Sequence, residues 1–202
     1  MSTEFQKAII TDQSQYGFEL SEKEIERLGV YYEFVLEHNE LLHLVGPCSA
    51  EEFARRHILE SLTMLRYLPE KALIADIGSG SGLPAVPCLI VREGLRANLI
   101  ESKEKKAVFL HEACEKLGLT DRVKIINKQF EEAEIGGADL VSCRALDKFT
   151  QKLPKILRWS KGRKKLFFGG PNLREELIKQ GCRVEEELMP FSEQRYLFRV
   201  NA

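Results

Sequence analysis

The feature that most constrains this chain is a glycine-rich loop between an apolar run and a helical pattern. The loop reads Gly78-Ser79-Gly80-Ser81-Gly82, after the apolar run 72–77 and before a helical pattern that begins at Leu83. Glycine lets the backbone turn sharply and come close to a ligand, because it has no side chain to clash. Between a strand and a helix, such a loop is typical of a nucleotide-binding βα unit; elsewhere it predicts only a tight turn.

The spacing of the glycines distinguishes two kinds of ligand. A dinucleotide loop follows GxGxxG, in which the third glycine lets the helix pack closely on the strand beside a pyrophosphate. Here that third position is Leu83, and the third glycine stands one residue earlier, at Gly82. S-adenosylmethionine (SAM) has no phosphate, so its loop accommodates only methionine and ribose parts. The pattern favours SAM, with NAD as the alternative.

Short apolar runs alternate with helical patterns from residue 72 onward. We expect strands at 72–77, 97–101, 123–127, 138–143, 164–169, 182–188 and 194–200. We expect the intervening helices at 83–92, 103–117, 147–158 and 172–180. Strands that alternate with helices form right-handed βαβ units, and the last two strands lie too close together for a helix between them. The prediction is an α/β, Rossmann-like class I SAM-dependent methyltransferase fold, with a seven-stranded, mostly parallel sheet ending in an antiparallel hairpin.

The region before the first strand is expected to be helical after a loose start. Residues 1–20 show weak periodicity, so we expect a loosely held arm there. Capping boxes at Ser21–Glu24 and Ser49–Glu52 then predict the starts of two amphipathic helices. We expect one methyltransferase domain over residues 1–202, in which residues 1–70 pack on a SAM-binding core of residues 71–202.

The composition excludes several classes of protein. The chain is 44% hydrophobic and 30% charged with a formal net charge of -1, so RNA binding would need a local basic patch. Its five cysteines form no CxxC pair, which argues against disulfides and against a metal site. Signal-peptide, membrane-span and sustained heptad patterns are missing, so we expect a cytoplasmic monomer without membrane contact. HExxH, GxSxG and P-loop lysine motifs are missing as well, which disfavours metalloproteases, serine hydrolases and NTPases.

Polar residues near the ends of the expected strands complete a candidate site. Glu101 closes the second strand, where a carboxylate can accept hydrogen bonds from both ribose hydroxyls. Phe130 and Glu131 follow the third strand and could flank an adenine, although core packing explains them equally well. Arg144 follows the fourth strand, at the edge where open α/β sheets bind ligands, and could hold a carboxylate or phosphate through paired N–H groups.

Four segments of the chain together resemble one known family. They are Arg56-His57-Ile58-Leu59-Glu60-Ser61, Asp76-Ile77-Gly78-Ser79-Gly80-Ser81-Gly82-Leu83-Pro84, Leu99-Ile100-Glu101-Ser102 with Lys105-Lys106, and Ser142-Cys143-Arg144-Ala145. In this order they are similar to the glucose-inhibited division protein B family, the small-subunit ribosomal RNA guanine-N7 methyltransferases. The likeness runs from about Asn39 to Arg199, and each segment alone would be unspecific.

The resemblance implies a SAM-dependent enzyme that methylates guanine N7 in 16S ribosomal RNA, with this RNA or the small ribosomal subunit as partner and no metal. Guanine N7 has a lone pair and no proton, so the reaction needs alignment rather than a general base, and no catalytic residue is assigned. The expected SAM contacts are Asp76, Gly78, Gly80, Gly82, Leu83, Glu101, Ser102, Phe130, Glu131 and Arg144. The expected substrate contacts are Asn39, Arg56, His57 and Arg144.

The substrate side departs from the family pattern. The family's GLPGIP is Gly82-Leu83-Pro84-Ala85-Val86-Pro87 here, and NxxxNLT survives as Asn39 followed by His43, Leu44 and Val45. The family's lysine before a glycine after the fifth strand is missing from Phe168-Gly169-Gly170-Pro171. Two alternatives therefore stay open: methyl transfer to another RNA or a small molecule, and a non-catalytic ribosome-binding protein with a relic SAM pocket.

Overall fold

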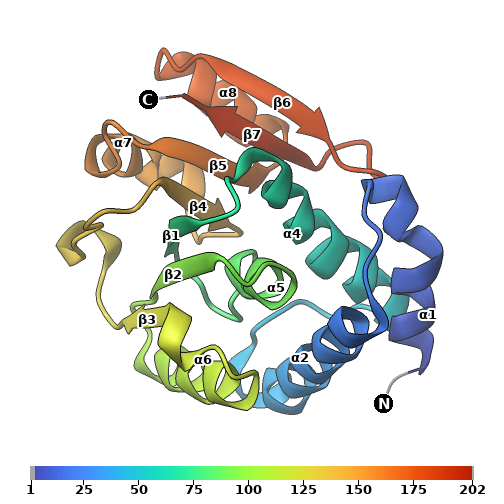
Figure 1. The fold of residues 1–202 in the computed structure, drawn as a ribbon. Helices are drawn as coiled ribbons and strands as arrows, with labels where there is room; N and C mark the ends of the chain where they lie inside the picture. Colours follow the sequence, from blue (N-terminus) through green and yellow to red (C-terminus); the bar gives the residue numbers. More distant parts are fainter. Residues whose placement is uncertain (1–2, 202) are drawn as a thin grey trace.

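The computed structural model describes residues 3–201, which form a seven-stranded sheet with helices on both faces (Figure 1). The strands are β1 (Ala72–Ile77), β2 (Leu95–Ile100), β3 (Val123–Ile126), β4 (Leu140–Arg144), β5 (Lys164–Gly169), β6 (Val184–Leu188) and β7 (Tyr196–Val200). Their order is β3-β2-β1-β4-β5-β7-β6. Strand β7 runs antiparallel to both β5 and β6, and the other neighbours are parallel. The predicted sheet and its terminal hairpin are confirmed.

The helices fall into an N-terminal group and a group that connects the strands. The N-terminal group is α1 (Thr3–Asp12), η1 (Gln13–Tyr16), α2 (Glu22–Leu42), α3 (Ala50–Glu52), η2 (Phe53–Leu59), α4 (Glu60–Leu62) and η3 (Thr63–Tyr67). The connecting group is α5 (Ala85–Val91), α6 (Glu104–Lys116), η4 (Thr120–Arg122), η5 (Phe130–Glu132), α7 (Phe149–Trp159) and α8 (Pro171–Lys179). Both predicted capping boxes are present, at Ser21 before α2 and at Ser49 before α3.

Alternate residues of the central strands face two separate cores, because successive side chains of a strand point to opposite faces of the sheet. Ile74 belongs to a core shared with α2, α5 and α6. Ala75 belongs to the core shared with α7 and α8. Residues Phe167 and Phe168 divide in the same way on β5. The strands are therefore buried on both faces, as in doubly covered α/β sheets.

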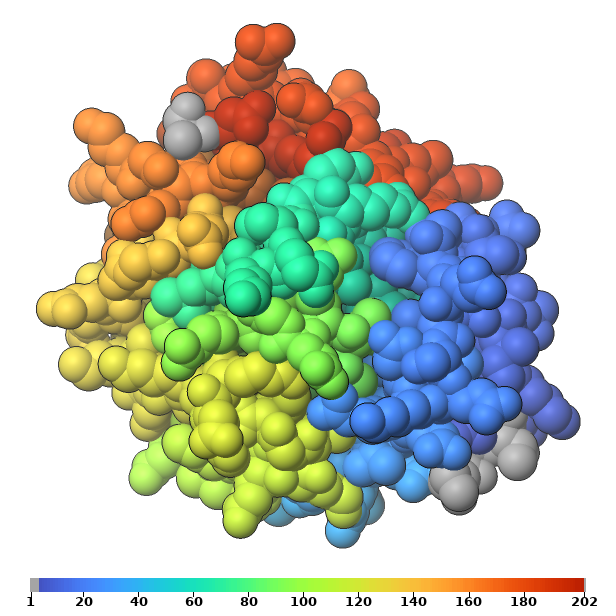
Figure 2. All heavy atoms as spheres, viewed as in Figure 1, coloured from blue at the N-terminus to red at the C-terminus, as the bar shows by residue number. Residues whose placement is uncertain are grey.

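Residues 3–20 do not form the loose arm expected over residues 1–20, of which the first two lie outside the described residues. Helix α1 is well packed: Phe5, Ile9 and Tyr16 are each fully buried. The Phe5 ring stacks on Tyr32 of α2 and meets the edge of Phe53. Figure 2 shows this N-terminal block, in blue, lying against the teal segment that precedes β1. The weak periodicity was misleading because a ten-residue helix has room for only a few core-facing side chains.

Residues 50–67 form one continuous helical segment that changes its winding. It begins as α3, widens into the π-helix η2, narrows again through α4 and ends as the 3₁₀ helix η3. In Figure 1 this segment, labelled α4, lies between the sheet and α1. Wide π turns inside helices are frequent at functional sites. The π turn here carries Arg56 and His57, two residues expected on the substrate side.

The reversal of strand order marks the place where ligands bind. Strand β1 lies between β2 and β4, so the connections after β1 and β4 diverge from each other. In open α/β sheets the carboxyl ends of such strands form the ligand crevice. The glycine loop follows β1 and Arg144 ends β4. The fold therefore brings the two strongest sequence signals to the same edge.

Candidate cofactor and acceptor site

The glycine loop lies directly against the end of β2. The backbone N–H groups of Gly78 and Ser79 donate to the carbonyl of Ile100 at 2.8 and 3.1 Å. Gly78 has φ +64°, and a Cβ there would lie 2.6 Å from Cδ1 of Leu146. This position therefore requires glycine for its backbone conformation and for its close contact.

Glu101 connects the glycine loop to the segment that follows β2. Its Oε2 accepts from the Gly80 N–H at 3.0 Å, and its Oε1 accepts from the Lys103 N–H at 2.8 Å. The carboxylate is thereby held in one orientation at the wall of a cavity. Each carboxylate oxygen has further acceptor capacity, as the predicted contact with ribose hydroxyls requires.

The glycine loop lines a cavity of about 410 Å³, here called the loop cavity. Its lining includes Gly78, Ser79, Gly80, Ser81, Leu83, Glu101, Ser102, Lys103, Gln129, Arg144 and Leu146, with Leu44 and Val45 from the N-terminal region. Cavities of roughly 300–1,000 Å³ hold ligands of nucleoside size and larger. The mixed polar and apolar lining fits a ligand with both ribose and aliphatic parts.

Asp76 lies fully buried beneath the loop with one oxygen free. Its Oδ1 accepts from the Ser142 hydroxyl at 2.6 Å, whereas Oδ2 has no hydrogen-bond partner. Burial raises the pKa of the carboxyl to about 7, against the lowering effect of the Ser142 and Ser79 hydroxyls. An unpaired buried carboxylate oxygen is costly, and a cationic ligand group nearby would lower that cost. The SAM molecule carries such a group, its ammonium, so these residues fit the predicted cofactor.

A second cavity of about 710 Å³, here called the arginine cavity, adjoins the first. His57, Arg144 and Ala145 line both cavities. The rest of its lining comprises Arg56, Glu60, Phe168, Gly169, Gly170, Pro171, Asn172, Met189, Gln194, Arg195 and Tyr196. The segment that departs from the family pattern, Phe168 to Pro171, therefore forms one wall of this cavity.

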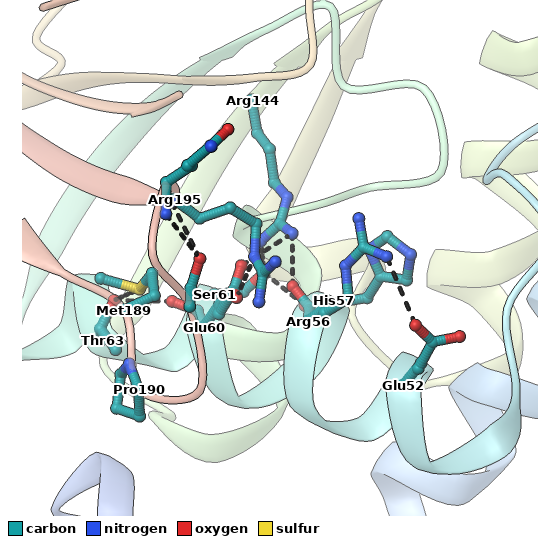
Figure 3. A network of polar contacts seen from close by, with 12 residues as sticks. Glu52, Arg56, His57, Glu60, Ser61, Thr63, Arg144, Met189, Pro190 and Arg195 are labelled. Carbon is teal, nitrogen blue, oxygen red and sulfur yellow. Dashed lines mark hydrogen bonds and ion pairs between the residues drawn. The ribbon is translucent and has the colours of Figure 1, made fainter. Parts of the chain in front are cut away.

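Glu60 holds two arginines at the junction of the cavities (Figure 3). Its carboxylate is 2% exposed and lies 3.2 Å from Nη2 of Arg144 and 2.7 Å from Nε of Arg195. Arg144 also donates to the Arg56 carbonyl, and its guanidinium lies over the Phe168 ring at 5.4 Å. Desolvation lowers the pKa of Arg144, against the opposing effect of Glu60. Paired with Glu60 in this way, Arg144 is fixed between the cavities rather than free in solvent.

His57 and Arg56 bring further polar atoms to the same place. The Nδ1 atom of His57 and the Nε atom of Arg56 are buried without hydrogen-bond partners. Burial, together with the charges of Arg144, Arg56 and Arg195, lowers the pKa of His57 to about 3. The imidazole is therefore neutral at pH 7 and offers both a donor and an acceptor.

Several predicted residues lie outside the cavity linings. Phe130 packs edge-on against Trp159 in the core, and Glu131 lies 3.6 Å from Lys155. A Cβ on Gly82 would meet Val86 at 2.5 Å, so this glycine serves the packing of the loop on α5. Asn39 accepts from the backbone N–H groups of Leu44 and Val45, both at 2.8 Å, and so shapes the cavity wall.

The site also contains residues that sequence reasoning did not select. Tyr31 of α2 is fully buried and donates to the Ser81 carbonyl at 2.9 Å, which braces the glycine loop. Glu60 stood inside a recognised motif without an assigned role, and the motif was the signal that could have identified it. Arg195 and Gln129 had no signal in the sequence, because nothing local marks them as neighbours of the loop.

Two kinds of feature are missing from residues 3–201: a metal-binding cluster and a membrane-spanning helix. His, Cys, Asp and Glu side chains do not gather there in groups of three or more that could hold a metal ion. Among the same residues, no helix combines the length and the apolar character needed to span a membrane.

Several related proteins share one name, and most of this chain aligns with them. Residues 24–187 match the family described as rRNA small subunit methyltransferase G. Proteins named ribosomal RNA small subunit methyltransferase G include one from Rhizobium meliloti, 32% identical over 88% of this chain and 86% of that protein. One from Wolinella succinogenes is 32% identical over 91% of this chain and 93% of that protein. One from Pelotomaculum thermopropionicum is 39% identical, and the aligned part covers 45% of its length.

Solved structures show the same fold at low sequence identity. The magnesium protoporphyrin IX methyltransferase of Synechocystis PCC 6803, solved with bound SAM, has a TM-score of 0.58 at 16% identity, with 91% of this chain and 99% of that chain covered. The M1A22 tRNA methyltransferase of B. subtilis has a TM-score of 0.56 at 18% identity. The aligned part covers 70% of this chain and 65% of that chain. The predicted fold is thus confirmed, and the family match confirms a SAM-dependent methyltransferase. The family match at residues 24–187 covers more than half of this chain, so the chain belongs to the rRNA small subunit methyltransferase G family.

Proposed function

We propose that this protein transfers the methyl group of SAM to N7 of a guanine in 16S ribosomal RNA. In this proposal the loop cavity holds SAM and the arginine cavity receives the guanine. The proposal is supported by family membership and by the shared lining of the two cavities at His57, Arg144 and Ala145. The small ribosomal subunit or its RNA is the proposed partner, and a reaction in the cytoplasm is part of the same proposal. The expected monomer stays a prediction.

Residues in the lining of the loop cavity, and Asp76 buried beneath the glycine loop outside that lining, have separate proposed roles in holding the cofactor. Glu101, fixed by the N–H groups of Gly80 and Lys103, would accept from the ribose hydroxyls. The free Oδ2 of Asp76 would offset the positive charge of the ammonium, directly or through a water molecule. Gly78 keeps the backbone close to β2 and leaves room for the ligand. When bound, SAM supplies a methyl group on a positively charged sulfur.

The observation that carries the proposal is that the arginine cavity contains no effective general base. Glu60 is almost completely buried, and both its oxygens are engaged by arginines. His57 has its pKa lowered to about 3, so it takes up a proton poorly at neutral pH. This arrangement favours an acceptor atom that has a lone pair and no proton to lose. A purine N7 meets this requirement, whereas hydroxyl and amino acceptors are poorer matches.

The arginines favour guanine over adenine. The edge of guanine that carries N7 also carries the O6 acceptor, whereas adenine has an amino donor at that place. Arg144 and Arg195 present N–H donors in this cavity and Phe168 presents a ring for stacking. Arginine donors would pair with O6 and would leave N7 free to face the loop cavity. These arginines also supply positive charge where the family's lysine is missing.

The proposal is tested by incubating the purified protein with labelled SAM and small ribosomal subunits that lack N7 methylation. We expect labelled 7-methylguanosine after digestion of the RNA, with the Gly78→Val variant as an inactive control. No label in any small-subunit RNA, despite measurable SAM binding, would contradict the proposal. Label in an RNA-free extract that is lost when small molecules are removed would instead support a small-molecule substrate, part of the first alternative given above.

A further inference from the structure

The turn between β6 and β7 lines part of the arginine cavity and also carries an exposed aromatic ring. Met189, Gln194 and Arg195 of this turn line the cavity. Phe191, between them, is 59% exposed. Such a ring contributes little burial to the folded state. The ring centre lies 6.1 Å from that of the buried Tyr16, so one part of the ring packs on the N-terminal region and the rest is open to solvent.

Phe191 also has an unusual backbone conformation. Its φ is +56°, in the left-handed region that bulky residues rarely adopt. Among the described residues, the non-glycine positions with positive φ are His43, Ala145, Lys148 and Phe191. Ala145 lines both cavities, and His43 and Lys148 each adjoin a residue of the loop cavity. Backbone strain is thus concentrated around the two cavities, as it is at functional sites in general.

Hydrogen bonds hold the turn in one conformation. The Met189 N–H donates to the Arg195 carbonyl at 2.8 Å. The Ser192 hydroxyl oxygen accepts from the Arg195 N–H at 2.9 Å. Tyr16 donates from its hydroxyl to the Pro190 carbonyl at 3.3 Å, which ties the turn to the N-terminal region. The exposed ring therefore belongs to a preorganised surface, for which binding costs little ordering entropy.

An arginine lies against this ring. The guanidinium of Arg55 lies 5.4 Å from the centre of the Phe191 ring. Arg55 comes from the same π turn as Arg56, whose carbonyl accepts from Arg144 (Figure 3). Aromatic rings and arginine planes are the surfaces on which unstacked RNA bases lie. The arginines here have carboxylate partners, such as Asp12 at 2.5 Å from Arg55, so stacking rather than net charge would dominate.

We propose that Phe191, backed by Arg55, stacks against an RNA base that flanks the methylated guanine. The inference rests on the proposed function, because the guanine must enter the arginine cavity, and the turn that carries Phe191 lines that cavity. Stacking of the neighbouring base would keep the target nucleotide unstacked from the RNA and directed into the cavity. Phe191 is thus a substrate-binding residue outside the SAM site.

The test compares Phe191→Ala, Phe191→Tyr and the control Ile178→Ala in methylation of protein-free 16S rRNA and of assembled small subunits. Ile178, on α8, is 58% exposed and so matches Phe191 in exposure. We expect Phe191→Ala to raise the KM for RNA about tenfold, the scale of one lost stacking contact. The kcat and the Kd for SAM should stay within twofold. Phe191→Tyr and Ile178→Ala should resemble the unaltered protein.

Filter binding of the same variants to 16S rRNA separates failure of this inference from failure of the proposed function. If the unaltered protein binds RNA without methylating it, the proposed function fails, and the stacking inference is judged by whether Phe191→Ala weakens binding. A KM within twofold of the unaltered value, or a change in kcat alone, would overturn the inference. An effect seen with assembled subunits but not with protein-free RNA would assign Phe191 to a protein contact instead. The Phe191→Ala effect should persist at raised salt, because stacking is not screened as phosphate contacts are.

Discussion

Gly78 has the strictest steric requirement among the residues of the loop cavity. We expect Gly78→Val to abolish SAM binding in a protein that still folds, because the new Cβ would lie 2.6 Å from Leu146 and φ is +64°. Isothermal titration with SAM measures the loss. The matched control is Gly118→Val, where φ is +65° but a Cβ meets no atom within 4 Å. Unchanged SAM affinity in folded Gly78→Val would remove the loop from the site.

Asp76 should make SAM binding depend on pH. Its pKa is about 7 in the cofactor-free protein, so the carboxyl gains negative charge as pH rises through that value. The ionised form attracts the ammonium of SAM, and we therefore expect SAM affinity to rise between about pH 6 and pH 8. Titrations at several pH values check this, with Asp76→Asn as the variant in which the rise is lost. A rise that persists in Asp76→Asn would assign the pH dependence to another group.

At the scale of elements, helix α1 is an integral part of the fold. We expect Phe5→Ala to lower the free energy of unfolding by about 3–5 kcal/mol, because the Phe5 ring is fully buried against Tyr32 and Phe53. Urea denaturation measures the change. Ile10→Ala on the same helix is the control: Ile10 is 57% exposed, and its substitution should cost no more than about 0.5 kcal/mol. Equal effects of the two substitutions would indicate that α1 is loosely held after all.

The N-terminal elements also act on the site from a distance. Tyr31 of α2 holds the glycine loop through the Ser81 carbonyl, and Asn39 at the end of α2 holds the segment containing Leu44 and Val45. The loop cavity is therefore assembled from the sheet and from helices that precede it in the chain. A Rossmann-like core by itself would lack one wall of this cavity.

At the scale of the whole molecule, the half-buried His57 and the buried Asp76 have opposite effects on stability. His57 has a folded-state pKa of about 3, below its ordinary value, so its contribution is lost as pH falls from about 6.5. Asp76 has a folded-state pKa of about 7, above its ordinary value, so its protonated form stabilises the folded state at acidic pH. That stabilisation is lost as pH rises from about 4 to about 7.

Urea denaturation of the cofactor-free protein at several pH values separates the two contributions. Relative to the unaltered protein, we expect His57→Gln to lose less stability on acidification between about pH 6.5 and pH 4. Asp76→Asn should lose more stability over the same range. Parallel stability curves for all three proteins would show that neither group has its pKa shifted in the folded state.

Local patterns were sufficient to predict most of the elements. The apolar run 72–77 coincides with β1, and the capping boxes at Ser21 and Ser49 lie where helices begin. Strand alternation, capping and glycine turns depend on residues that are neighbours in the sequence, so these patterns can be recognised without the fold. The reversal of strand order, which brings the ends of β1 and β4 side by side, follows from the same alternation of strands and helices. It brought Gly78, Glu101 and Arg144 together as expected.

Long-range packing decided the rest of the site. Nothing near Arg195 in the sequence indicates that it pairs with Glu60, since the contact depends on where the last hairpin joins the sheet. Phe130 could equally have faced a ligand or the core, and contact with Trp159 placed it in the core. The loose arm expected from the sequence was wrong for residues 3–20 for the same reason. The partners that bury Phe5, such as Phe53, are distant in the sequence, and their free energy of burial is realised only when the chain has folded.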